Sequence, residues 1–390
     1  MKILYTNFHE GPWIGGHTNY VLRLAGALAA RGHEVSVAAP PGSSLLRLAG
    51  QMPGIKAYPQ VFPSRPAPLL RARGAMRALL CQGAFDIVHV NGSADHRLAM
   101  LARLGMVRPP RIVWTKHNDV PVSSFGNWLR ARMATDHAIA VCHYVAGILQ
   151  DSPYARRGIS TVHNGIDTDY FSPLSGPEVE RLRAQWTHGE DVLLLGSNAG
   201  TDEYKGWLDL VRAMRSLPEA LRARVRVVLA GVPPKQSNWD EVIACGLASQ
   251  VHYAGQLEDV RPMLAALDVG FVLSYRDTLS FACREMMAMG KPVIAARRGG
   301  LPESIDDGQD GWLVPPRDLQ PQAADEEALA GNPAVPGPVP RAGRAPAAGA
   351  HAPAVPRPRG DHGVRAAGLS RRAGHSRASS MRCPPARAEA

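Results

Sequence analysis

The sequence lacks the marks of a disulfide-stabilised, zinc-binding or membrane-spanning protein. Its 390 residues include five cysteines, odd in number and scattered, with no C-x-x-C pair. This argues against a disulfide framework or a zinc site and suits a reducing compartment. No uncharged apolar run is long enough to cross a bilayer, and the N-terminus reaches His9 and Glu10 before a signal-peptide core could form. We therefore expect a cytoplasmic protein.

The last part of the chain lacks Phe, Tyr, Trp, Ile and Lys altogether. Residues 319–390 are dominated by Ala, Pro, Arg and Gly, with ten arginines against five acidic residues. This segment carries half of the formal net charge of +10, so the remainder is only mildly basic and does not indicate a nucleic-acid partner. It has too little apolar surface to offset its ordering entropy, so we expect it to be disordered. A proline-rich docking tail is the alternative.

Two series of alternating strands and helices precede this tail. Strands are predicted at 3–6, 35–39, 87–90, 112–115 and 138–141, then at 192–195, 225–230, 251–254, 269–273 and 293–295. Strands separated by helices, such as those expected at 18–30 and 206–217, imply parallel sheets covered on both faces. We predict an α/β protein with Rossmann-like domains at 1–163 and 178–318, joined by a Gly/Asp/Pro-bearing linker at 164–177.

Two carboxylates separated by seven residues stand out in the second series. Asp277 follows a predicted strand, and Glu285 lies in the first turns of a helix expected to begin near Ser280. The carboxyl edge of a parallel sheet is where α/β folds bind ligands. A carboxylate there can accept hydrogen bonds from adjacent sugar hydroxyls, and helix-start N–H groups can bind phosphate. The alternative is that both acids only complement the helix dipole.

The run SYRDTLSFACREMMAMGKPVIAARRGG resembles the signature of retaining glycosyltransferase family 4, which has the GT-B fold of two Rossmann-like domains facing a cleft. The acid pair, the GKPVI strand and Gly299-Gly300 carry the resemblance, and the following GGLPESI and GQDGWLV extend it. The resemblance implies that Glu285 binds the nucleotide ribose and that Asp277 contacts the donor sugar, with Thr278 and Leu279 in the same donor site. The family usually has Glu where this chain has Asp277, one methylene shorter.

Other pieces of the family pattern occur in the expected order. Gly15-Gly16 follows the first strand, where a missing Cβ and a helix start allow close approach of a diphosphate. The resemblance implies that His117 contacts the donor and that Lys205 neutralises the leaving diphosphate. The family normally places an arginine shortly before this lysine, where this chain has Ser197 or Asn198. Arg276, Arg284 or Arg297 could supply the missing charge.

Two further motifs suggest a metal site and a dinucleotide site, and we interpret both differently. Asp167-Thr168-Asp169 matches a D-x-D metal motif but lies in the linker, so we interpret it as turn chemistry and expect no metal. Gly231 follows a strand without a full dinucleotide fingerprint, and we assign it to the wall of the nucleotide site, with no cofactor. The segment 66–80 is a basic amphipathic helix, either an ordinary surface helix or a contact with an anionic membrane.

The resemblance implies transfer of a hexosyl-type group from a nucleotide sugar to a saccharide or lipid-linked acceptor, with retention of configuration, in envelope polysaccharide or lipopolysaccharide assembly. We place such an enzyme in the cytoplasm, with a peripheral position at the inner face of the membrane as a second option. Two alternatives remain: a sugar-nucleotide epimerase of similar architecture, and an inactive nucleotide-sugar-binding remnant. The composition of residues 319–390, rich in Ala, Pro, Arg and Gly, is also typical of a shifted reading frame in GC-rich DNA. This predicts that the natural C-terminus was replaced.

Overall fold

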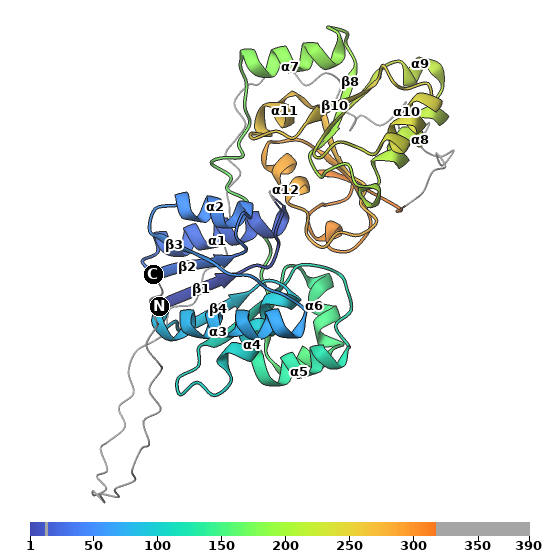
Figure 1. Cartoon of the computed structure of the whole chain (residues 1–390). Helices are drawn as coiled ribbons and strands as arrows, with labels where there is room; N and C mark the ends of the chain where they lie inside the picture. The colour runs from blue at the N-terminus through green and yellow to red at the C-terminus, as the bar shows by residue number, and fades with distance from the viewer. Residues whose placement is uncertain (12–14, 317–390) are drawn as a thin grey trace, which may run out of the picture. The chain divides into compact units, whose positions relative to one another are not determined.

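Short apolar strands alternate with helices to build two parallel sheets in the computed structural model, which describes residues 1–11 and 15–316 (Figure 1). The predictions about the tail at 319–390, including disorder, docking and a shifted frame, lie outside these described residues. The predicted α/β class with two Rossmann-like domains is confirmed.

The first domain is a seven-stranded parallel sheet in the order β3-β2-β1-β4-β5-β6-β7. Its strands are β1 (Lys2–Thr6), β2 (Glu34–Ala39), β3 (Ile55–Pro59), β4 (Ile87–Val90), β5 (Arg111–Lys116), β6 (His137–Ala140) and β7 (Ile159–Thr161). Its helices are α1 (Gly16–Ala30), α2 (Ser44–Gln51), α3 (Pro66–Gly83), α4 (Ser93–Arg103), α5 (Phe125–Ala134), α6 (His143–Gln150) and the 3-10 turn η1 (Pro153–Arg156).

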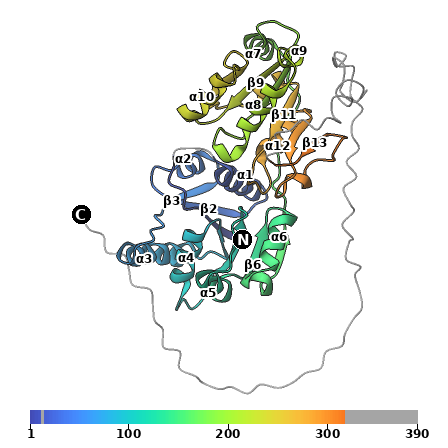
Figure 2. The ribbon, with the colours of Figure 1, turned by 90° about the vertical axis from the view of Figure 1, so that its right-hand side faces the viewer.

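Side-chain alternation along the strands divides this domain into two core layers. On β1, Ile3 and Tyr5 pack with α1 and α2, whereas Leu4 packs on the other side with α3 and α4. All three side chains are buried. A strand buried on both faces needs an apolar residue at every position, which explains the continuous apolar runs in the sequence. Figures 1 and 2 show α1 and α2 on one face of the sheet and α3 and α4 on the other.

The second domain is a six-stranded parallel sheet in the order β10-β9-β8-β11-β12-β13. Its strands are β8 (Leu193–Ser197), β9 (Val225–Ala230), β10 (Val251–Gly255), β11 (Val269–Val272), β12 (Val293–Ala296) and β13 (Gly311–Val314). Its helices are α7 (Pro177–Thr187), α8 (Trp207–Ser216), α9 (Glu219–Arg222), α10 (Gln236–Ala244), α11 (Arg261–Ala266) and α12 (Phe281–Ala288), with the 3-10 turns η2 (Glu203–Lys205) and η3 (Leu301–Glu303).

Both sheets reverse their strand order at the first strand of the domain. The switch lies between β1 and β4 in the first sheet and between β8 and β11 in the second. Loops at the carboxyl ends of the strands diverge at such a point and leave a crevice in which α/β folds bind ligands. The segments that follow these four strands therefore hold the candidate site.

Several element boundaries differ from the sequence prediction. The strands β3 and β7 were not predicted, and both are sheet edges with little fully buried apolar surface. The helix predicted at 206–217 begins at Trp207, because Gly206 has a φ of 71° and lies outside the right-handed helical region.

Candidate active site

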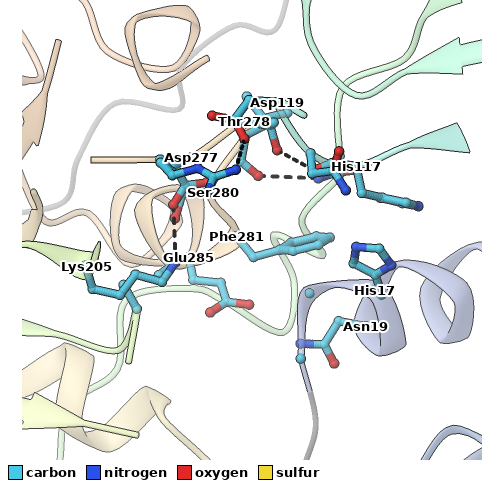
Figure 3. Close-up of a pocket in the computed structure, with 18 of the residues that line it drawn as sticks. His17, Asn19, His117, Asp119, Lys205, Asp277, Thr278, Ser280, Phe281 and Glu285 are labelled. Carbon is cyan, nitrogen blue, oxygen red and sulfur yellow. Dashed lines mark hydrogen bonds and ion pairs between the residues drawn. The ribbon is translucent and has the colours of Figure 1, made fainter. Parts of the chain in front are cut away.

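A cavity of about 540 Å³ lies among the loops at the carboxyl ends of the two sheets (Figure 3). Its volume is in the range of small-molecule sites. The first domain and the linker contribute Gly15, Gly16, His17, Asn19, His117, Asn118, Asp119 and Asn164. The second domain contributes Asn198, Ala199, Tyr204, Lys205, Arg276, Asp277, Thr278, Leu279, Ser280, Phe281, Ala282 and Glu285.

The structure brings eight of the nine sequence-predicted site residues to this cavity. They are Gly15, Gly16, His117, Lys205, Asp277, Thr278, Leu279 and Glu285. The ninth, Gly231, is not among the lining residues, so the structure does not place it in the cavity wall. A Cβ on Gly231 would come within 2.8 Å of the Gly200 Cα. This glycine therefore permits its loop to pack closely against the loop of Gly200.

Lys205 and Asp277 form an ion pair inside the cavity. The lysine Nζ lies 3.4 Å from the aspartate Oδ2, and both side chains are largely buried. Gly206 fixes the lysine's position, because a side chain there would clash with the backbone carbonyl of Leu273. The close approach of η2 to the end of β11 thus sets the cation beside the carboxylate.

Gly299 and Gly300 support the loop that carries Asp277. A Cβ on Gly299 would clash with the carbonyl oxygen of Asp277, and one on Gly300 would clash with that of Thr278. Only glycine lets the two loops pack backbone against backbone here. The glycine pair in the sequence motif therefore holds the acidic loop in place rather than lining the cavity.

Glu285 is the most enclosed carboxylate of the cavity, with a side chain only 8% exposed. Its Oε1 accepts a hydrogen bond from Arg23 Nη2 at 2.9 Å, and its Oε2 accepts one from Asn198 Nδ2 at 2.8 Å. Ser280 is the N-cap of α12, and its side chain accepts a hydrogen bond from the amide of Cys283. This N-cap sets the start of the helix that presents Glu285.

The first domain faces the cavity with histidines that burial keeps neutral. The ring centroids of His17 and His117 are 4.3 Å apart, and His9 stacks edge-on against His17 at 4.7 Å. Burial, reinforced by the neighbouring histidines, lowers the pKa of His117 well below its ordinary value. Burial and His9 lower the pKa of His17 to about 4. Both imidazoles therefore act as uncharged hydrogen-bonding groups at neutral pH.

Asn91, after β4, sets the tautomer of His117. The amide nitrogen of Asn91 donates to the carbonyl of Thr6 at 2.9 Å, which turns its Oδ1 toward His117 Nε2 at the same distance. The imidazole Nε2 must then carry the proton and donate it. The His117 Nδ1 is left as a hydrogen-bond acceptor.

The structure also distinguishes among the arginines that could replace the family arginine. Arg276 lines the cavity and pairs with Asp119 across the domains at 3.1 Å. Arg284 instead donates to the Asn164 carbonyl, and Arg297 pairs with Asp307 beside β13. Of the three candidates, Arg276 alone is a lining residue.

Two further contacts join the domains, one at the cavity and one outside it. Thr278 Oγ1 donates to the carbonyl oxygen of His117 at 2.7 Å. The carboxylate of Glu303, in η3, accepts hydrogen bonds from the amides of His143 and Tyr144 at 2.7 and 2.8 Å and lies 2.9 Å from His163 Nε2. Burial alone would raise the pKa of Glu303, but these amide donors and His163 lower it. A carboxylate of the second domain therefore caps the first turn of α6.

The other motifs have local structural roles. Asp167 Oδ1 accepts hydrogen bonds from the amides of Asp169 and Tyr170, which makes the D-x-D motif part of a turn. The predicted basic helix is α3, whose Arg73 and Arg77 donate to backbone carbonyls at the end of α4. No helix within residues 1–11 and 15–316 combines the length and hydropathy that a membrane span needs.

Sequence reasoning missed several polar residues of the cavity. His17 Nδ1, Asn164 Oδ1 and Asn198 Oδ1 are buried atoms for which no partner is found among the described residues. Buried polar atoms are nearly always hydrogen-bonded, so these three atoms at the cavity can each form a further hydrogen bond with a water molecule or a bound ligand. The one available signal was position, since Asn164 lies in the linker phrase and Asn198 follows β8.

Comparison with known proteins identifies both domains. Residues 14–170 match the model of Glycosyltransferase Family 4, and residues 189–330 match that of Glycosyl transferases group 1. The chain is 27% identical over 318 residues to N-acetyl-alpha-D-glucosaminyl L-malate synthase of Bacillus anthracis, covering 77% of this chain and 81% of that protein. It is also 27% identical over 325 residues to phosphatidyl-myo-inositol mannosyltransferase of Mycobacterium tuberculosis, covering 79% and 82%.

Among solved structures, the chain is similar to Anabaena HepE in complex with UDP-glucose. The TM-score is 0.68 at 21% sequence identity, and the match covers 82% of this chain and 87% of that one. At this identity the likeness shows the fold, which is the GT-B arrangement expected from the sequence.

Proposed function

Because the chain belongs to the family 4 glycosyltransferases with the GT-B fold, we propose that it transfers a sugar from a nucleotide-sugar donor to a saccharide or lipid-linked acceptor with retention of configuration. The observation that carries this proposal is the convergence of Lys205, Asp277 and Glu285 with the Gly15-Gly16 helix start on one cavity. A cation and a helix N-terminus suit a diphosphate, and two carboxylates suit sugar hydroxyls.

Each group then has a distinct task in the donor complex. Glu285 accepts hydrogen bonds from the ribose hydroxyls, and Asp277 accepts them from the donor sugar. Lys205 and the amides at the start of α1 hold the diphosphate. His117, neutral and with Nδ1 free to accept, binds a hydroxyl of the donor sugar without adding charge.

The chemical step relies on positioning and electrostatics. The bond between the anomeric carbon and the diphosphate oxygen breaks, and the acceptor oxygen bonds to that carbon on the same face. The acceptor proton passes to the departing phosphate oxygen, so the protein need supply no separate base. Negative charge grows on the diphosphate as it leaves, and Lys205 stabilises it most in the transition state. We propose that no divalent metal takes part, because Lys205 and the α1 start serve the phosphates.

The acceptor class and the pathway extend this proposal. One relative is named for phosphatidyl-myo-inositol and another for malate, so relatives differ in acceptor. We propose a saccharide or lipid-linked acceptor of cell-envelope polysaccharide or lipopolysaccharide assembly, in the cytoplasm. Peripheral contact with an anionic membrane would use the exposed part of α3, where Arg71 faces solvent.

A panel of nucleotide sugars tests the proposal. The true donor at one hundred times its dissociation constant should stabilise the protein by about 2.7 kcal/mol, which a thermal-shift assay resolves. NMR of the product should then show the anomeric configuration of the donor. Isomerised donor without any acceptor would indicate an epimerase instead, and donor binding without turnover across an acceptor panel would indicate an inactive remnant.

A further inference from the structure

Arg23, on α1 of the first domain, contacts the carboxylate that the proposed function assigns to the donor ribose. Its Nη2 lies 2.9 Å from Glu285 Oε1, and the arginine side chain is itself only 30% exposed. Asn198 of the second domain occupies the other carboxylate oxygen. The Glu285 carboxylate is thus oriented by one donor from each domain.

The guanidinium of Arg23 is held by aromatic and backbone contacts as well. It lies 4.8 Å from the ring centroid of Phe281 in α12 and 5.5 Å from that of Phe171 in the linker region. Its Nη1 also donates to the Gly165 carbonyl at 3.4 Å. A planar cation held against aromatic rings is preorganised for a carboxylate in a way that a flexible ammonium is not. Two segments, α12 and the linker, therefore define where Arg23 points.

The contact leaves hydrogen-bonding capacity for ribose on the same carboxylate. Each carboxylate oxygen can accept two hydrogen bonds, and Arg23 and Asn198 use one on each. Two acceptor positions remain, one per oxygen, which match the two adjacent hydroxyls of a ribose. The arginine and the ribose can thus bind Glu285 together.

We propose that Arg23 is a positioning residue for ribose recognition, and this inference rests on the proposed function of Glu285. Arg23 fixes the carboxylate in the orientation that receives the 2′ and 3′ hydroxyls. Because it belongs to the first domain, full affinity for a ribonucleotide requires contact between the domains. The second domain alone carries the carboxylate and Asn198 but lacks the orienting donor of the first domain.

A comparison of nucleotides with and without ribose hydroxyls tests this inference. The first probes are UDP, ADP and GDP, whose affinities for the wild-type protein are measured by calorimetry. The second probe is the 2′,3′-dideoxy form of the nucleotide that binds most tightly. Arg23→Gln should weaken ribonucleotide binding about tenfold or more, because the Glu285 carboxylate loses one of its two orienting donors and ribose binding must then order it. It should change the dideoxy affinity by less than about twofold, because Arg23 then has no hydroxyl contact to influence.

Matched variants distinguish the orienting effect of Arg23 on Glu285 from the effect of its positive charge alone. Arg31→Gln removes the same charge from an exposed position at the end of the same helix, and both affinities should stay at wild-type values. Arg23→Lys keeps the charge but not the planar fork, so it should recover only part of the affinity. Adding Arg23→Gln to Glu285→Gln should cause little further loss, because the two residues act as a unit.

The outcomes distinguish this inference from the function on which it rests. Equal weakening of both nucleotides by Arg23→Gln would mean that the arginine only stabilises the domain contact, and an unchanged ribonucleotide affinity would mean that it does not act on Glu285; either overturns the inference. Wild-type protein that binds none of the three ribonucleotides would contradict the proposed function itself. Retained dideoxy binding shows that the variant is folded.

Discussion

The two domains share one strand order yet present opposite chemistry to the cavity. The second domain supplies the charged Lys205, Asp277 and Glu285. The first supplies glycines at a helix start and histidines, with a pKa of about 4 for His17. Its one lining carboxylate, Asp119, is neutralised by Arg276 of the other domain.

This difference shows that the fold sets where a site lies but not what it binds. Both sheets offer the same crevice beside the switch strands. Charge in the second domain suits an anionic nucleotide sugar, whose diphosphate and ribose need a cation and a carboxylate. Neutral imidazoles in the first domain suit uncharged hydroxyls, which need hydrogen bonds without a fixed charge.

Removing the cation of the second domain should have the largest effect on activity. We expect Lys205→Ala to lower kcat by about a hundredfold or more, since transition-state charge on the diphosphate loses its partner. Donor affinity should fall less, because the contribution is larger in the transition state than in the ground state. Steady-state kinetics check this, with the exposed Lys235→Ala as control. A preserved kcat with a raised KM would reassign Lys205 to uniform binding.

Neutralising the enclosed carboxylate should act on binding instead. Glu285→Gln should weaken nucleotide binding by about 1.5–3 kcal/mol, because hydrogen bonds to a charged acceptor become bonds to a neutral amide. Calorimetry with the nucleoside diphosphate measures the change, and Glu258→Gln at an exposed site of the same domain should leave it alone. Unchanged affinity in Glu285→Gln would refute the ribose assignment.

The neutral histidines predict a pH dependence of stability. Burial lowers the folded-state pKa of His17 from 6.5 to about 4, so between these values the unfolded chain binds the extra proton. The stabilisation of the neutral form is therefore complete above about pH 6.5 and declines as the pH falls toward 4. We expect His17→Gln to reduce this decline by on the order of 1 kcal/mol of unfolding free energy. Denaturant titrations of both proteins from pH 7 to 4 measure this. If His17 titrated normally, the unfolding free energy would fall with pH equally in the wild type and in His17→Gln.

The smallest expected effect concerns divalent metal. Asp167 serves a turn and Lys205 faces the cavity, so EDTA should leave initial rates unchanged. A rate assay before and after chelation checks this. Activity lost in EDTA and restored by manganese would show that the phosphates need a metal after all.

Sequence patterns located the charged half of the site better than its neutral half. Asp277 and Glu285 follow a strand in a local pattern that predicts a site at the sheet edge, and the family resemblance supplied Lys205. His17 and Arg23 depend on partners far away in the chain, and no local pattern reveals such contacts. Gly231 follows a strand too, but its role in packing against another loop could not be inferred from its position.

The sequence likewise predicted the central strands of the fold but not all of its edge strands. Central strands such as β1 and β8 are continuous apolar runs, whereas the edge strands β3 and β7 carry polar or half-exposed residues and were missed. Edge strands bury less, so their sequences are less constrained toward apolar residues.

The cap that Glu303 places on α6 also has a kinetic consequence. When the domains separate, two amides lose their acceptor and the carboxylate loses its donors, at a cost of about 1 kcal/mol. That cost shifts the ratio of joined to separated molecules about fivefold. The capping contact therefore favours the joined form. If spent nucleotide leaves only from the separated form, Glu303, which lies outside the cavity, would help to set how often the enzyme turns over.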